Sequence, residues 1–266
     1  GVFPSFIDAF FESTSSFTTT GSTIIQNIEA LPRGLVFWRS FSQWLGGMGI
    51  LVFAVSLLPA LGISGQQIAT AETPGPTLSK LKPKMADSAK LLYWIYGSLT
   101  LAAIVLLLAG GLNLFDACIV AFGSVASGGL INYSDGAAHF DSAYVEFVIA
   151  LFTTLACVNF TLYYHLVKGQ LHSFLRDREL HTFLTLLASG ILLVTLDLWL
   201  TDTAGSLPSA FRQAFFHTTS FATTTGVFSV NYDAWPSFSK MILFLLMMIG
   251  ACSASTGGGI KVIRVV

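Results

Sequence analysis

Three short polar segments of the chain hold the residue types that coordinate a monovalent cation through backbone oxygens. They are built from threonine, serine and glycine, and they comprise Thr19, Thr20 and Gly21; Ser127, Gly128 and Gly129; and Thr224, Thr225 and Gly226. Rings of backbone carbonyls can replace the hydration shell of such a cation inside a membrane pore. Glycine suits these segments because it adopts positive φ freely and lets the backbone approach a ligand closely. We call them the turn segments, and they predict cation coordination by carbonyl oxygens.

A second glycine-rich stretch lies inside an apolar run near the end of the chain. Its candidate gating residues are Gly250, Ser253, Ser255, Thr256, Gly257, Gly258, Gly259 and Lys261. Glycine costs about 1 kcal/mol relative to alanine inside a helix, so this stretch predicts a helix that a loop breaks into two halves. A loop beneath the turn segments is well placed to gate a pore. A nucleotide-binding loop is not expected, because that motif needs lysine directly after glycine and here Ile260 intervenes.

Internal repetition links the turn segments to the elements that must position them. Residues 9–21 align without a gap on residues 214–226, and a weaker third copy ends at Gly129. Each copy is a short helix, a Thr/Ser/Gly turn and a full span, which together form a membrane-pore-membrane unit. For a single copy, a turn that only joins helices or a set of small packing residues is the simpler alternative.

Three copies in register favour convergence of the turns. Irregular backbone at membrane depth is tolerated only where it lines water or packs in protein. We therefore predict that Gly21, Gly129 and Gly226 lie at similar depth near one axis, with their carbonyls toward it. The negative C-terminal ends of the short helices would face the same axis and favour a cation.

The composition places the chain in a membrane. Its 266 residues have a mean hydropathy of +0.72 and only 10% are charged, which is outside the range of a soluble protein. The net charge of −1 offers no basic face for nucleic acid. Cys118, Cys157 and Cys252 show no metal or disulfide spacing and are interpreted as buried thiols. No nucleophile, base and orienting group stand together, so neither an enzyme nor a covalently bound cofactor is expected.

Hydrophobic runs define the expected spans. Runs long enough to cross roughly 30 Å of hydrocarbon cover residues 35–61, 91–112, 142–167 and 182–200. A fifth run, 238–266, is interrupted by glycines, and three shorter runs, at 4–17, 115–125 and 208–221, predict re-entrant helices.

Basic residues orient these spans, because Lys and Arg collect on the cytoplasmic side. Alternating spans put nine on one side, which we take as cytoplasmic, and four on the other: Lys80, Lys82, Lys84, Lys90, Lys168, Arg176, Arg178, Lys261 and Arg264 against Arg33, Arg39, Arg212 and Lys240.

A few polar residues fall within or beside the spans. Arg39, Glu146 and Lys240 lie near the outer ends, where snorkelling to the interface explains them. His217 takes the place of Glu12 in the repeat, and we expect it to be a packed or capping residue.

With these residues in hand, the chain resembles the TrkH-like members of the Trk/Ktr/HKT superfamily of potassium transporters. The resemblance covers essentially the whole chain. Its most specific parts are Phe17-Thr18-Thr19-Thr20-Gly21, residues 31–47, Thr223-Thr224-Thr225-Gly226, and Ser255-Thr256-Gly257-Gly258-Gly259-Ile260-Lys261. It implies an all-α integral membrane fold, with repeated membrane-pore-membrane units around a pseudo-fourfold pore and re-entrant pore helices. The units expected here are residues 1–66, 67–175 and 176–266.

The resemblance also implies roles for the two glycine-rich features. Gly21, Gly129 and Gly226 would be three of four filter glycines, and the loop from Gly250 to Gly259 would gate beneath them. Relatives with serine at the first filter position tend to favour sodium, so Gly21 points to potassium. Two departures stand out. The outer helix of the first quarter and the whole fourth quarter are missing, so we interpret the chain as a fragment, and Ser127 replaces the more common threonine.

These observations favour potassium uptake by channel-like permeation across the cytoplasmic membrane, with K⁺ as the transported ion. The alternative is a sodium- or proton-coupled secondary transporter with alternating access, which also uses interrupted helices. Turn segments that all open to the outer side favour the channel. The resemblance further implies a multi-pass homodimer in the cell inner membrane, surrounded by lipid and bound to a cytoplasmic nucleotide-binding regulatory subunit.

Overall fold

The computed structural model describes residues 3, 5–49 and 85–265, and every regular element in these ranges is helical, which confirms the all-α class. The α-helices are α1 (Phe6–Phe17), α2 (Arg33–Gly47), α5 (Met85–Ala109), α6 (Leu114–Val125), α7 (Ala143–Ala156), α8 (Phe160–Val167), α9 (Leu171–Leu175), α10 (Arg178–Leu200), α11 (Leu207–Ala222) and α12 (Ser237–Ile249). The connections contain the 3-10 helices η3 (Gly136–Phe140), η4 (Tyr232–Ala234) and η5 (Val262–Arg264).

Three short helices occupy the predicted positions directly before the turn segments. They are α1, α6 and α11, and each begins with a polar cap whose side chain accepts a backbone N–H three residues later: Ser5 from Asp8, Asn113 from Asp116, and Ser206 from Ser209. Helix α1 packs on α2, α6 packs on α5 and α7, and α11 packs on α10 and α12. A local capping signal in the sequence therefore starts each short helix, and neighbouring helices of the same repeat hold it.

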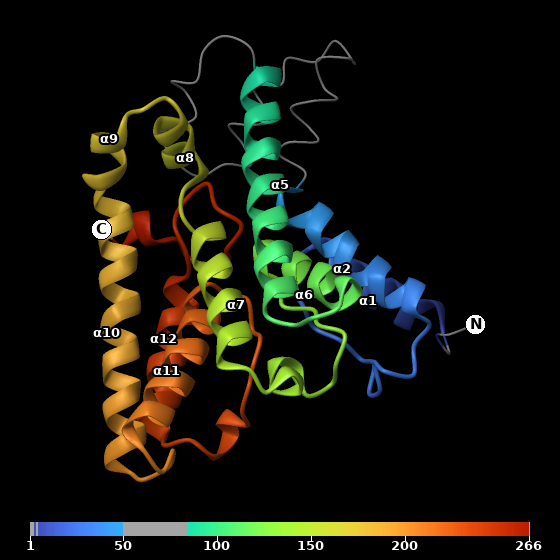
Figure 1. Ribbon diagram of the computed structural model, residues 1–266, viewed down its shortest axis with the longest axis vertical. Helices are drawn as coiled ribbons and strands as arrows, with labels where there is room; N and C mark the ends of the chain where they lie inside the picture. The colour runs from blue at the N-terminus through green and yellow to red at the C-terminus, as the bar shows by residue number, and fades with distance from the viewer. Residues whose placement is uncertain (1–2, 4, 50–84, 266) are drawn as a thin grey trace.

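Two of the predicted spans are single helices. The apolar part of α5 (Leu92–Ala109) and the whole of α10 (Arg178–Leu200) are long and apolar enough to cross a membrane. They run along the long axis of the molecule, with α7 between them in the view of Figure 1. Among other residues, α10 leaves Leu192 and Leu200 exposed, as a lipid-facing helix does.

The predicted span 35–61 is interrupted in its described part. Helix α2 ends at Gly47, and Gly49 follows with a φ of 52°. The left-handed conformation of this glycine cannot continue an α-helix. The rest of that span lies outside the described residues, as do Lys80, Lys82, Lys84 and the expected boundary between residues 66 and 67.

The predicted span 142–167 is wrong as a single helix. It consists of α7 and α8, which are bent by 87° at a short break. Asn159 causes part of the break, because its side chain caps α8 by accepting the N–H of Thr161 at 2.9 Å. The C-terminal end of α7 is also hydrogen-bonded to another segment, since the carbonyls of Ala156 and Cys157 accept backbone N–H groups from the glycine-rich stretch.

Snorkelling is the wrong explanation for Arg39 and Glu146. Arg39 is only 3% exposed, and its Nε lies 3.1 Å from the carboxylate of Glu12. Glu146 accepts two hydrogen bonds from Arg212, at 2.8 and 3.1 Å, across the α7–α11 interface. Lys240 is exposed in the first turn of α12, and its ammonium donates to the carbonyl of Asp233 at 2.9 Å. Two of the three charges thus pair between helices.

The buried pair between Glu12 and Arg39 generates a stability prediction. Arg39→Met in the complete protein should lower the free energy of unfolding by about 3–5 kcal/mol, because the Glu12 carboxylate keeps its burial and loses its counter-charge. Thermal unfolding in detergent measures this loss. Adding Glu12→Gln should recover most of it.

Lys240→Met is the control, because Lys240 is exposed, its ammonium donates to the carbonyl of Asp233, and its removal leaves no buried carboxylate without a counter-charge. Its loss should stay within about 1 kcal/mol. Equal losses for Arg39→Met and Lys240→Met would contradict the argument.

Candidate functional site

The three turn segments share one backbone conformation. Their first residues all have positive φ, at Thr19 (55°), Ser127 (53°) and Thr224 (56°). Their last residues are the glycines at positive φ, Gly21 (75°), Gly129 (72°) and Gly226 (77°). A residue other than glycine at positive φ costs of order 1–2 kcal/mol, so surrounding contacts must hold each turn.

Hydrogen bonds to the preceding short helix stabilise each turn. The last two N–H groups of each segment donate to one helix carbonyl: Thr20 and Gly21 to Ser15 at 3.0 and 3.5 Å, Gly128 and Gly129 to Gly123 at 3.1 and 3.2 Å, and Thr225 and Gly226 to Ser220 at 2.9 and 3.3 Å. These N–H groups of the turn segments are therefore satisfied by carbonyls of the short helices. By contrast, none of the turn-segment carbonyls accepts a hydrogen bond from the described part of the chain.

The segments follow one another side by side in chain order. A Cβ atom placed on Gly21 would lie 2.0 Å from the carbonyl oxygen of Gly128, and one on Gly129 would lie 2.0 Å from that of Thr225. Gly128 and Thr225 hold the same place in their repeats, so the contact is the same at both junctions. At Gly226 a Cβ would meet no described atom within 4 Å. Each glycine is thus required by both its φ and the next segment, except at Gly226, where only φ requires it.

Equivalent buried acceptors hold the chain beyond the first and third segments. Glu12 accepts the N–H of Ile24 at 2.7 Å, and His217 accepts the N–H of Ser229 at 3.4 Å, each across 12 residues. Both acceptors are almost inaccessible, with 3% and 0% exposure. His217 is therefore a packed residue, as expected, and it accepts a backbone hydrogen bond equivalent to the one that Glu12 accepts in the first repeat.

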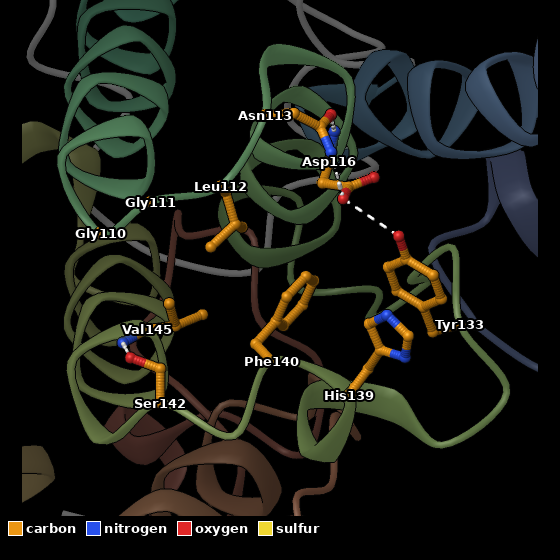
Figure 2. Close-up of a pocket in the computed structure, with 10 residues that line it drawn as sticks. All are labelled: Gly110, Gly111, Leu112, Asn113, Asp116, Tyr133, His139, Phe140, Ser142 and Val145. Atoms are coloured by element: carbon orange, nitrogen blue, oxygen red, sulfur yellow. Dashed lines mark hydrogen bonds between the residues drawn. The ribbon is translucent and has the colours of Figure 1, made fainter.

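In the second repeat the buried acceptor is Asp116, which lies one turn earlier in its short helix. Its carboxylate accepts hydrogen bonds from Asn113 at 2.7 Å, Asn132 at 2.6 Å and Tyr133 at 3.1 Å. Figure 2 shows Asn113 and Tyr133 reaching this carboxylate, with the ring of His139 stacked on Tyr133. Partial burial raises the pKa of Tyr133. The tyrosine therefore remains a donor to Asp116 at neutral pH.

A loop contact joins the first repeat to the second. Glu29 accepts hydrogen bonds from the N–H of Ser134 at 2.7 Å and from its hydroxyl at 2.8 Å. These bonds lower the pKa of Glu29, with the backbone bond contributing most. Glu29 is consequently ionised over the physiological range.

The glycine-rich stretch is non-helical, as predicted, from Gly250 through Lys261. We call residues 250–261 the glycine loop. It contacts two turn segments at the residues with positive φ: the N–H of Gly258 donates to the hydroxyl of Thr224 at 2.6 Å, and the hydroxyl of Ser127 donates to the carbonyl of Thr256 at 2.6 Å. The structure therefore brings the two predicted groups of residues into direct contact.

Polar groups within and beside the loop hold its path. Lys261 donates from its ammonium group to the carbonyl of Gly257, and Ser255 donates to the carbonyl of Cys252 at 2.5 Å. Glu179, at the start of α10, accepts the N–H of Ser253 at 2.5 Å and its hydroxyl at 2.9 Å. A carboxylate with 7% exposure thus anchors the loop from a neighbouring helix.

Comparison with known proteins decides the family. The family described as "TrkH: Cation transport protein" matches residues 3–266. The chain belongs to the TrkH family.

Named relatives agree with this placement. The Trk system potassium uptake protein TrkH of Escherichia coli K12 is 39% identical over 260 residues, covering 97% of this chain and 54% of the relative, and TrkG of the same organism is 38% identical over 265 residues. The crystal structure of the potassium transporter TrkH from Vibrio parahaemolyticus matches with a TM-score of 0.84 at 37% identity, covering 98% of this chain and 53% of that one. The chain spans about half the length of the relatives it matches.

Sequence reasoning missed several residues of the site. Glu179 and Gln43 are buried contacts of the glycine loop and of the second turn segment, respectively. In the sequence, Glu179 could have been recognised as an acidic residue in the first turn of an apolar span. No local sequence pattern identifies Gln43 as part of the site, because its hydrogen-bond partner Leu130 is 87 residues away.

The anchor at Glu179 generates a prediction for the loop. Glu179→Ala in the complete protein should speed hydrogen exchange of the amides at 250–259 by about tenfold to a hundredfold, since hydrogen bonds to a charged acceptor are worth roughly 1.5–3 kcal/mol. Mass-spectrometric hydrogen exchange in detergent measures it. Arg178→Ala, at the exposed neighbouring residue, is the control. Unchanged exchange in Glu179→Ala would show that the loop does not depend on this anchor.

Proposed function

We propose that this chain forms most of the pore of a potassium uptake protein and that its turn segments act as a selectivity filter for channel-like permeation. One observation carries the proposal. Three segments with the same backbone conformation lie side by side, with their N–H groups bound to the short helices and their carbonyls accepting no hydrogen bond from the described residues. Carbonyls left in this way can coordinate a dehydrated cation.

The short helices favour the same cation. Helices α1, α6 and α11 each end directly before a turn segment. The C-terminal end of a helix carries about half a negative charge, and three such ends near one path lower the energy of a cation there. Relatives named as potassium uptake proteins, together with Gly21 at the first filter position, support potassium as the ion.

A fourth segment would complete the filter. The contact from Gly21 to Gly128 repeats from Gly129 to Thr225, and the same step from Gly226 would reach the next segment. The relatives are about twice as long as this chain. We therefore propose that the remainder of the protein supplies the fourth unit of a pseudo-fourfold pore.

The glycine loop is proposed to gate this pore. Its bonds to Ser127 and Thr224 hold it against two of the turn segments, and short polar side chains satisfy its backbone. Release of these two bonds would separate the loop from the turn segments without unfolding a helix. We further propose a homodimer in the cytoplasmic membrane, with a cytoplasmic nucleotide-binding subunit that controls the loop.

Alternating access is the second candidate. The break between α7 and α8 lies against the break after α12, since the N–H of Cys252 donates to the carbonyl of Cys157 at 3.2 Å. Paired breaks suit a coupled transporter. Rubidium uptake into potassium-starved cells expressing the complete gene, measured with and without sodium and with and without an imposed pH gradient, separates the two. Uptake that is independent of sodium and of the proton gradient supports the channel, and strict dependence on either supports the transporter.

Gly21 should set ion preference. Gly21→Ser in the complete protein should lower discrimination of potassium over sodium, because a Cβ would lie 2.0 Å from the carbonyl oxygen of Gly128 and must displace it. Reversal potentials in mixed potassium and sodium measure the change. Gly97→Ser is the control, since a Cβ at Gly97 meets nothing within 4 Å. Equal reversal potentials for wild type and Gly21→Ser would count against the filter assignment.

The three consecutive glycines should hold the loop closed. Replacing Gly257, Gly258 and Gly259 by alanine should displace the loop, because a Cβ at Gly257 would lie 2.7 Å from Cys157 Sγ and one at Gly259 would lie 2.5 Å from the Cα of Gly250. Basal rubidium flux in proteoliposomes should rise at normal protein yield. Normal flux with loss of the response to the regulatory subunit would place the gate in another element.

A further inference from the structure

Gln43 lies between the first two turn segments, although it belongs to α2. Its side chain is completely buried, and its Oε1 accepts the N–H of Leu130 at 3.0 Å. Leu130 directly follows Gly129, so this bond holds the end of the second segment. A residue of the first repeat thus supports the backbone of the second.

Gly128 is a glycine for reasons of space and not of conformation. It is absent from the residues with positive φ, whereas Gly129 beside it has a φ of 72°. A Cβ on Gly128 would lie 2.2 Å from Gln43 Nε2, 2.4 Å from its Cδ and 2.7 Å from its Cγ. Its three nearest neighbours therefore all belong to one side chain. Gln43 occupies the volume that a side chain at position 128 would need.

The other two repeats fill the equivalent volume with threonine. Thr20 and Thr225 hold the place of Gly128, and their hydroxyls lie 2.8 Å from those of Thr18 and Thr223. In the second repeat Ala126 stands where Thr18 and Thr223 stand, so neither hydroxyl of the pair exists there. The amide of Gln43 takes the place of this threonine pair.

The amide nitrogen of Gln43 faces the segments without a protein partner. Nε2 is buried and finds no acceptor in the described part of the chain. A Cβ on Gly21 would lie 3.9 Å from it, which places the nitrogen between the first and second segments. An unpaired buried donor is unfavourable. Simple packing therefore does not explain a glutamine at this junction, and its amide is available to the segments.

We propose that Gln43 is a positioning residue for the filter and that Gln43 and Gly128 together replace the threonine pair of the other repeats. This inference rests on the proposed function. It predicts that a side chain at position 128 is excluded only while Gln43 is present, so the two positions are energetically coupled.

A double-mutant cycle on the complete protein tests the coupling. Gln43→Ala, Gly128→Thr and the double variant are purified, and the ratio of rubidium to sodium flux is measured in proteoliposomes. Each single change should lower the ratio. The double variant should lie about tenfold above the product of the two single effects, because side chains in contact couple by factors of this order. Ser42→Ala, whose hydroxyl bonds only carbonyls of its own helix, should leave the ratio unchanged.

Each outcome tests either the coupling between Gln43 and Gly128 or the proposed function. Single effects that multiply, or a wild-type ratio in Gln43→Ala, would overturn the inference while leaving the filter intact. A wild-type protein with no preference for rubidium over sodium would overturn the proposed function itself. Where Gly128→Thr fails to yield monodisperse protein, restored yield in the double variant supports the pair. Failure of the double variant as well contradicts it, since Gln43 would then be required by other contacts.

Discussion

The structure depends on how polar backbone is satisfied where regular helix stops inside a membrane. An unpaired backbone group in lipid costs several kcal/mol, so a turn at that depth survives only if its groups have partners. Here the short helix supplies one carbonyl, such as that of Ser15 or Ser220, for two consecutive N–H groups. This arrangement commits the N–H donors of the turns to the short helices, while the turn carbonyls accept no hydrogen bond from the described residues. The positive φ of the turns, their glycines and the neighbouring supports all follow from it.

Each repeat meets this constraint with different side chains. Glu12 with Arg39 supports the first segment, Asp116 with two amides and a tyrosine supports the second, and His217 supports the third. What is repeated is a buried acceptor on the short helix, at equivalent positions in the first and third repeats and one turn earlier in the second, and its chemical type varies with the neighbours available to it. This variation is the reason why the second copy is faint in the sequence although its backbone matches the others closely.

The same constraint couples the glycine loop to the turns. The loop needs donors and acceptors of its own, and it finds them on Ser127, Thr224, the buried C-terminal end of α7 and the carboxylate of Glu179. Two of these are turn residues. Any movement of the loop away from the turns would therefore break its hydrogen bonds to Ser127 and Thr224. The bend between α7 and α8 belongs to this system, because it frees the carbonyls that receive the loop.

The sequence by itself determined the helical class, the short helices with their caps, the turn segments and the break after α12, because each depends on residues close together in the chain. Tertiary structure decided the rest. The bend at Asn159 was invisible in an apolar run, since its other cause is a loop almost a hundred residues later. Arg39 and Glu146 looked like interfacial charges until packing supplied Glu12 and Arg212 as partners. Burial and pairing depend on which helices become neighbours, and no local pattern encodes that.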